Sequence, residues 1–126
     1  ETAIEQRTIL VIQDGASTAI RKRPDTGLLA GLYELPNVEG HLTEKAALAR
    51  VKAMGLEPLR IEALPDAKHI FSHIEWRMCA YRIAVSSLEE APREKFLFAD
   101  KRESAEKYAI PSAFRAYTRY MKEENT

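Results

Sequence analysis

Residues 68–73, with the sequence KHIFSH, place several side chains capable of hydrogen bonding and stacking within one short segment. Two imidazoles and a serine hydroxyl offer donors and acceptors, and a phenyl ring offers an apolar surface. The segment lies between two strand-like runs, where a connection that only reverses the chain would be rich in Gly, Asn, Asp or Pro. None of these four residue types occurs from Lys68 to Glu75. We therefore predict that this turn contacts a ligand.

The same side chains also have purely structural interpretations. A phenyl ring at the end of a strand more often belongs to the core, and on the residue pattern alone we favour core for Phe71 by roughly two to one. Ser72 can form a turn hydrogen bond with its own backbone. His69 and His73 lack a third ligand at a useful spacing, so we expect no zinc site. Trp76 is expected in the core beneath the turn.

The first half of the chain is expected to contain two antiparallel strands followed by a helix. Runs at 5–13 and 17–23 flank Asp14-Gly15, a pair typical of a hairpin. Thr43 is expected to cap a helix that ends at about Met54, where a glycine follows. The apolar face of this helix comprises Ala46, Ala47, Leu48, Val51 and Met54.

The second half is expected to supply the strands that hold the turn. Short strands are predicted at 58–64 and 68–71, followed by a long strand at 74–85 that is rich in Ile, Trp, Tyr and Val. A short helix is predicted at 101–108 and a last one at 111–122, opened by a proline. Together these elements predict an α+β fold, a mixed β-sheet flanked by α-helices. The other segments are an apolar stretch at 28–36, a polar loop at 86–94 and an apolar run at 96–98.

Length and charge limit the possible functions. A chain of 126 residues with 45% hydrophobic content suits one domain spanning residues 1–126. Nineteen basic residues balance nineteen acidic ones, so any contact with nucleic acid must be local. Cys79 is the only cysteine, which excludes an internal disulfide and a cysteine-based metal cage, and we expect a buried thiol.

The sequence shows neither a membrane span nor a secretory leader. It has no run of eighteen apolar residues and no basic-then-apolar leader, so we expect no membrane partner and a cytoplasmic location. The chain starts at Glu1 and enters a strand almost at once, and we expect it to be a piece of a longer protein.

Residues 21–23, residues 27–36 and the helix before Gly55 resemble a Nudix-type domain, whose members carry a similar Gly-Leu-aromatic-x-Leu/Phe-Pro strand. This resemblance spans most of the chain and implies a Nudix-like fold. Enzymes of that family hold Mg²⁺ on a helix of the form Arg-Glu-x-x-Glu-Glu-x-Gly, because a divalent cation that bridges phosphates needs several carboxylate oxygens.

The acidic residues of that helix are absent here. Counting back from Gly55 without gaps places Ala49, Lys52 and Ala53 at the three glutamate positions, and Glu44 is the only carboxylate left on the helix. We therefore expect no metal site and no diphosphate hydrolysis.

A Nudix frame without its acids resembles the C-terminal domain of MutY-type adenine DNA glycosylases, which remove adenine mispaired with 8-oxoguanine. Residues 71–73 match the recognition loop of that group, and residues 21–23, 27–36 and 68–73 occur in its order, followed by the strand with Trp76. The resemblance implies binding to double-stranded DNA that contains 8-oxoguanine opposite adenine, at the bacterial nucleoid. It also implies a separate N-terminal catalytic domain with a 4Fe–4S cluster, so we expect neither cofactor nor catalytic residue in this chain.

The resemblance suggests a role for each residue of the turn. Ser72 would form hydrogen bonds with the oxidised edge of the base, and His73 would contact the groove edge or a phosphate. Phe71 would pack beside the damaged pair if it is not a core residue. Lys68 and Arg77 flank the turn and are candidates for contact with the DNA backbone.

Two alternatives remain. The chain is either an active Nudix pyrophosphohydrolase of oxidised nucleoside triphosphates with a rearranged metal site, or a catalytically inactive Nudix-like domain that binds only protein. Arg21-Lys22-Arg23 is interpreted as a solvated strand edge or as a contact with phosphate or a neighbouring domain. Glu34 and Glu44 form a possible acid pair, although nothing in their spacing directs them at one substrate.

Overall fold

Two long strands, β1 (Ala3–Asp14) and β6 (Ile74–Ser86), run parallel through a mixed sheet in the computed structural model. The structure describes residues 2–86 and 96–122. Within them the sheet has the order β3-β2-β1-β6-β5, with β2 at Ser17–Lys22, β3 at Tyr33–Glu34 and β5 at Glu57–Ile70. Two short strands join this path at its sides: β4 (Asn37–Glu39) pairs with β1, and β7 (Leu97–Ala99) pairs with β2.

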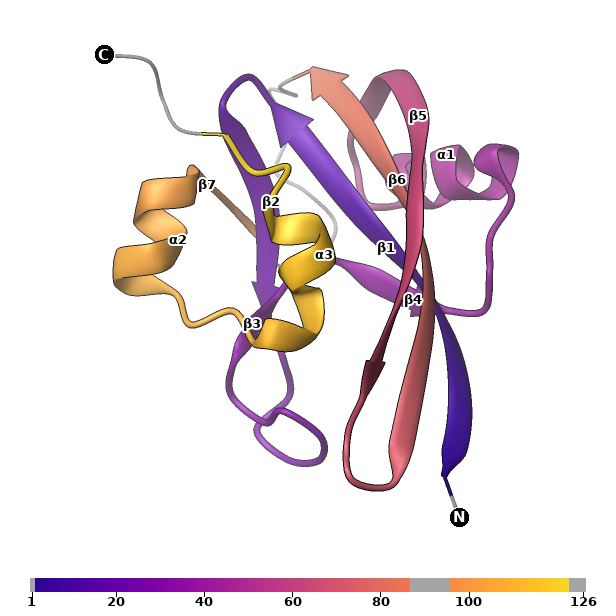
Figure 1. Cartoon of the computed structure of the whole chain (residues 1–126). Helices are drawn as coiled ribbons and strands as arrows, with labels where there is room; N and C mark the ends of the chain where they lie inside the picture. Colours follow the sequence, from indigo (N-terminus) through magenta and orange to yellow (C-terminus); the bar gives the residue numbers. More distant parts are fainter. Residues whose placement is uncertain (1, 87–95, 123–126) are drawn as a thin grey trace.

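Helices cover both faces of the sheet, which confirms the predicted fold class (Figure 1). Successive side chains of a strand point to opposite faces, so β1 contributes to two cores. Ile9 and Val11 pack with Phe114 and Tyr117, whereas Leu10 and Ile12 pack against α1 (Glu44–Ala53) on the other face. None of the helices in the described residues is long and apolar enough to cross a membrane.

The local signals of the first half behave as predicted. β1 and β2 form an antiparallel hairpin in which Asp14 pairs with Ser17, and Gly15 takes a φ of +62° in the turn. Thr43 caps α1 by accepting a hydrogen bond of 3.2 Å from the backbone N–H of Ala46. The helix stops before Gly55, whose φ is +92°. Three residues of its predicted apolar face, Ala47, Val51 and Met54, are buried, which confirms that part of the prediction.

The strand before the turn is longer than predicted. Separate strands at 58–64 and 68–71 were expected, but β5 runs from Glu57 to Ile70 and includes Pro65. The register against β6 shifts between Leu64 and Ala67, so the residue without an N–H group lies at a bulge. β5 is also an edge strand, which tolerates a missing donor.

The end of the chain is less helical than predicted. α2 (Lys101–Lys107) confirms the expected short helix and begins with a capping box made by Asp100 and Glu103. The predicted helix at 111–122 is instead a 3₁₀ turn, η1 (Ser112–Phe114), followed by the single turn α3 (Arg115–Thr118). Of the predicted polar loop, residues 87–94 lie outside the described residues.

Candidate functional site

The predicted turn is the tip of the hairpin formed by β5 and β6. Strand pairing extends to Ile70 opposite Glu75, and the backbone N–H of Phe71 then donates to the carbonyl of Ile74 over 2.7 Å. The carbonyl of His73 accepts a bond of 2.9 Å from the N–H of Ala3, which joins the tip to β1. The tip is therefore held by backbone bonds on two sides, and the hairpin projects at one end of the sheet (Figure 1).

A row of aromatic rings supports this tip from below. The ring of Phe71 lies 4.8 Å from that of His69 and 5.2 Å from that of Trp76, measured between centroids, and Trp76 lies 5.7 Å from Phe114. Trp76 is fully buried, which confirms its predicted place in the core, whereas Phe71 is half-buried. The row connects the tip to the core through edge-to-face contacts, a favourable geometry for aromatic pairs.

Ser72 and His73 are exposed at the tip. Neither side chain has a hydrogen-bond partner among the described residues, so the hydroxyl is not engaged in a turn bond with its own backbone. Phe71 contributes to the aromatic support, and the side chains of Ser72 and His73 offer free donors and acceptors to solvent.

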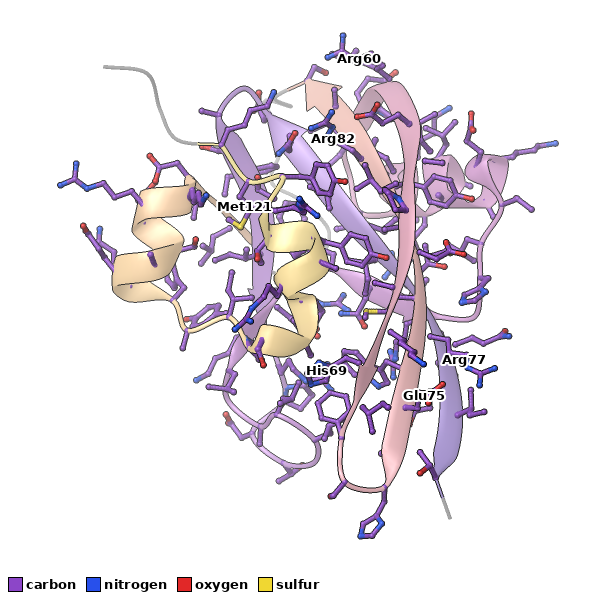
Figure 2. The ribbon with its side chains drawn as sticks, viewed as in Figure 1. Arg60, His69, Glu75, Arg77, Arg82 and Met121 are labelled. Carbon is purple, nitrogen blue, oxygen red and sulfur yellow. The ribbon has the colours of Figure 1, made fainter. Side chains whose placement is uncertain are left out.

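Lys68 and Arg77 are directly opposite each other in the hairpin. Because neighbouring residues of a strand point to opposite faces, Arg77 lies on the face opposite to that of Trp76. Its Nε donates to Oε2 of Glu75 over 2.7 Å, and this bond holds the pKa of Glu75 below its ordinary value, with a smaller contribution from the charge of Lys68. Figure 2 shows Glu75 and Arg77 on the side of the hairpin away from His69. All five predicted site residues thus lie on one hairpin, but not on one face of it.

A buried charge network lies next to the aromatic row and was not predicted. The carboxylate of Glu34 accepts bonds of 2.8 Å from Nε of Arg21 and 2.5 Å from Arg23, and one of 2.9 Å from the amide of Asn37. Arg21 and Arg23 are mostly buried, so their interpretation as a solvated edge is wrong, and only Lys22 between them is exposed. Contact of this segment with phosphate or with a neighbouring domain stays a prediction. No signal in the sequence reveals the pair, because it depends on the register of β2 and β3, which sets Arg21 opposite Glu34.

Arg23 links this network to the hairpin. Its guanidinium carbon lies 5.7 Å from the ring centroid of Trp76, and that of Arg7 lies 5.2 Å from the same ring. Arg23 also donates to the carbonyl of Leu28 and, through its backbone N–H, to that of Leu32. Arg23 therefore holds the loop after β2 and also contacts Trp76, which supports the tip.

The described residues form neither a metal site on α1 nor an acid pair between Glu34 and Glu44. Ala49, Lys52 and Ala53 are all exposed on α1, and no group of three His, Cys, Asp or Glu side chains in residues 2–86 and 96–122 is arranged to hold a metal ion. Glu44 is exposed at the start of α1, whereas Glu34 is committed to the network, so they form no acid pair.

The single cysteine is not part of any candidate site. Cys79 is half-buried rather than fully buried as predicted, and its Sγ contacts Oγ1 of Thr8 at 3.4 Å.

The class of this chain is shown by a family match over most of its length. A model of the NUDIX domain matches residues 7–120. The chain therefore belongs to the NUDIX domain family.

More specific relatives are DNA-repair proteins. Over 95 residues the chain is 37% identical to the adenine DNA glycosylase of Mus musculus, an alignment that covers 68% of this chain and 18% of the relative. The chain thus spans less than a fifth of the length of that relative. Among solved structures, the C-terminal domain of mouse MUTYH, in complex with human PCNA, superimposes with a TM-score of 0.63 at 25% identity, covering 96% of this chain and 94% of that one. The predicted resemblance to the C-terminal domain of adenine DNA glycosylases is confirmed.

Hydrolases of the family share the fold at lower identity. The MutT NUDIX hydrolase from Burkholderia pseudomallei superimposes with a TM-score of 0.61 at 16% identity, covering 90% of this chain and 95% of that one.

Proposed function

We propose that this chain is the lesion-recognition domain of an adenine DNA glycosylase, and that it binds double-stranded DNA at 8-oxoguanine opposite adenine without being catalytic itself. The observation that carries this proposal is the pair of exposed, unpaired polar side chains, Ser72 and His73, on a tip that an aromatic row holds in place. Binding residues must be both accessible and fixed, and these two residues meet both conditions.

Ser72 suits the chemical difference between guanine and its oxidised form. Guanine presents two acceptors, N7 and O6, on its major-groove edge. In 8-oxoguanine N7 carries a hydrogen and C8 carries a carbonyl, so one acceptor becomes a donor. A serine hydroxyl can accept from N7–H through its lone pairs and donate toward the new carbonyl. A buried polar group left unpaired costs about 1–3 kcal/mol, so this residue supplies a moderate preference over guanine.

His73 is assigned a separate role in detecting the intact mispair. In the syn form that pairs with adenine, 8-oxoguanine turns its 2-amino group into the major groove, where a neutral imidazole nitrogen can accept from it. We expect His73→Ala to weaken binding to the intact mispair more than binding to the product duplex, in which the adenine has been removed. Equal losses on both duplexes, measured by fluorescence anisotropy, would contradict this role.

Base excision requires residues outside this hairpin. The adenine must be flipped out and protonated by an acid, and the developing sugar cation must be stabilised by a carboxylate. We assign these steps, with a 4Fe–4S cluster, to an N-terminal catalytic domain of the full-length glycosylase, acting on DNA in the cytoplasm. The hairpin would hold the strand with the lesion while the other domain binds the adenine.

The test compares adenine removal opposite 8-oxoguanine and opposite guanine by the full-length protein. We expect Ser72→Ala to reduce the preference for 8-oxoguanine by about tenfold, within the range that one unpaired polar group can produce. Ser17→Ala, at the far end of β1 and β2, removes a hydroxyl away from the tip and should leave the preference unchanged. An unchanged preference in Ser72→Ala would favour the second candidate, a domain that binds only protein, for which the MUTYH domain in complex with PCNA is the precedent.

A further inference from the structure

A second surface beside the hairpin carries only basic residues among its ionisable groups. A groove of about 610 Å³ lies between β5 and the segment formed by η1 and α3. Its ionisable lining residues are Lys68, His69, Arg115 and Arg119, and no acidic residue of the described chain lines it. Asp66, the nearest acid in the sequence of β5, lines a different cavity with Glu75 and Arg77, and Lys68 lies between the two cavities and lines both. The groove is therefore positive in a chain whose net charge is zero.

The two arginines of this groove are free, unlike several other arginines of the surface. Arg77, Arg82 and Arg102 each form an ion pair with a glutamate. Arg115 and Arg119 are exposed, and within residues 2–86 and 96–122 their guanidinium groups have neither an ion pair nor a hydrogen bond. A carboxylate partner would lower the affinity of an arginine for an external anion, so unpaired arginines are the better candidates for binding one.

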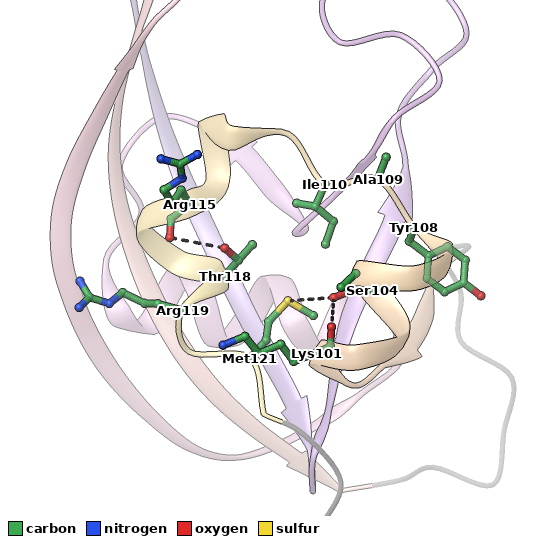
Figure 3. Close-up of a pocket in the computed structure, with 10 residues that line it drawn as sticks. Lys101, Ser104, Tyr108, Ala109, Ile110, Arg115, Thr118, Arg119 and Met121 are labelled. Carbon is green, nitrogen blue, oxygen red and sulfur yellow. Dashed lines mark hydrogen bonds between the residues drawn. The ribbon is translucent and has the colours of Figure 1, made fainter.

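The two arginines act on the same side of α3. They are four residues apart, a spacing that brings side chains together on one side of a helical turn. Figure 3 shows both projecting from α3 on the side away from α2. A second hollow between α2 and α3, of about 480 Å³, is also lined by both arginines and adds Lys101, again without an acidic lining residue.

The groove is continuous with the tip of the hairpin. His69 lines the groove, and its ring packs on that of Phe71 at 4.8 Å, one residue from Ser72. The two walls of the groove are joined by Tyr117 of α3, whose hydroxyl donates to the carbonyl of Pro65 in β5 over 2.8 Å. A polymer that contacts the tip and follows the surface toward α3 therefore passes His69 and reaches the two arginines.

We propose that this groove binds the sugar–phosphate backbone of the same duplex that the tip contacts, with Arg115 and Arg119 each holding one phosphate. This inference rests on the proposed function, because the continuity with the tip selects DNA over an acidic protein segment. The planar guanidinium group matches two phosphate oxygens, and such contacts fix the position of a protein on DNA without sequence preference.

The proposal is tested by the salt dependence of DNA binding by the full-length protein. The probes are a duplex with 8-oxoguanine opposite a non-hydrolysable adenosine analogue and an undamaged duplex of the same sequence. Each phosphate contact contributes about 0.9 to the slope of log affinity against log salt, so Arg115→Gln with Arg119→Gln should reduce that slope by about 1.8 on both duplexes. Between 50 and 200 mM salt the difference in affinity between wild type and variant should then shrink by about twelvefold.

Two further variants serve as controls. Lys45→Gln with Arg60→Gln removes the same two charges from exposed positions on α1 and on β5 near its start, and should leave the slope at the wild-type value. Arg115→Lys with Arg119→Lys keeps both charges and should retain the slope, which separates loss of charge from damage to α3. A slope in the glutamine variant equal to that of the wild type, or a loss matched by the Lys45 and Arg60 control, would overturn the proposal.

The same measurement distinguishes this proposal from the function on which it depends. Ser72→Ala should change the ratio of affinities for the two duplexes and leave the slope unaltered, whereas the arginine variant should do the reverse. If only the arginine variant has its expected effect, the groove binds DNA and lesion recognition by Ser72 fails. If only Ser72→Ala has its effect, the tip recognises the lesion and the groove serves another ligand.

Discussion

The ring of Phe71 meets that of Trp76 edge to face, with centroids 5.2 Å apart and planes inclined by 72°. Through this contact a half-buried residue of the tip is connected to a fully buried residue of the core. Core and ligand contact were opposed interpretations of Phe71, yet the geometry allows one ring to pack below the tip while its exposed part remains available.

Truncation of this ring should destabilise the fold. We expect Phe71→Ala to lower the free energy of unfolding by about 1–2 kcal/mol, because a half-buried ring loses part of the usual cost of truncation together with its aromatic contacts. Urea denaturation measures the change. Ile70→Ala, at a neighbouring side chain that is 59% exposed, should change it by about 0.5 kcal/mol or less. Equal effects of the two substitutions would show that Phe71 does not support the tip.

The buried network should contribute more than any surface ion pair. Glu34→Gln removes the negative charge that lies between Arg21 and Arg23, and we expect it to lower the free energy of unfolding by about 3 kcal/mol. Glu106→Gln breaks the exposed pair with Arg102 and should cost less than about 1 kcal/mol. Thermal or urea unfolding of both variants checks the contrast. Similar losses in the two would mean that the network contributes little to stability.

The Arg77 side chain should control the titration of Glu75. Its hydrogen bond and charge hold the pKa of Glu75 below the ordinary value of 4.5, so Arg77→Gln should raise that pKa, and Lys68→Gln should raise it less. A lowered pKa in the folded state stabilises the fold at pH values above 4.5, and this contribution is lost as pH falls through the lowered pKa. Carboxyl NMR titration measures the pKa directly. No rise in the Arg77 variant would show that the Arg77–Glu75 hydrogen bond does not form in solution.

Hydrolysis of nucleotides should be absent. With Ala49, Lys52 and Ala53 exposed on α1, this helix lacks the carboxylate oxygens that Mg²⁺ needs to bridge phosphates. We expect no Mg²⁺-dependent release of pyrophosphate from 8-oxo-dGTP, with an active NUDIX hydrolase assayed in parallel as the positive control. Measurable turnover by this chain, lost on addition of a chelator, would instead support the hydrolase alternative.

Features with local causes were predictable from the sequence. The hairpin at Asp14-Gly15, the Thr43 cap and the stop at Gly55 each depend on residues a few positions apart, whose backbone preferences act in any context. The last helix was mispredicted because its backbone is tightened by tertiary contacts. Tyr117 is anchored to β5, and the N–H groups of Tyr120 and Met121 bond carbonyls three residues back, as in a 3₁₀ turn.

The candidate site also has features that the sequence predicted and features that it could not predict. Residue types identified the turn at 68–73 as a ligand contact, and the resemblance to the Nudix helix motif identified the missing acids of α1. Sequence could not reveal that Arg21 and Arg23 surround Glu34, or that Arg77 is paired on the far side of the hairpin. Those relationships depend on strand register and on which face each strand buries.

The sequence by itself therefore determined the family frame, the loss of the metal helix and the segment most suited to contact a ligand. Only the tertiary structure decided which of the charges are free to act. Arg23 and Arg115 have the same side chain, yet Arg23 is mostly buried and paired with Glu34, whereas Arg115 is exposed beside the hairpin. The physical reason is that a charge is neutralised or left available by groups far along the chain, which come together only when the sheet assembles.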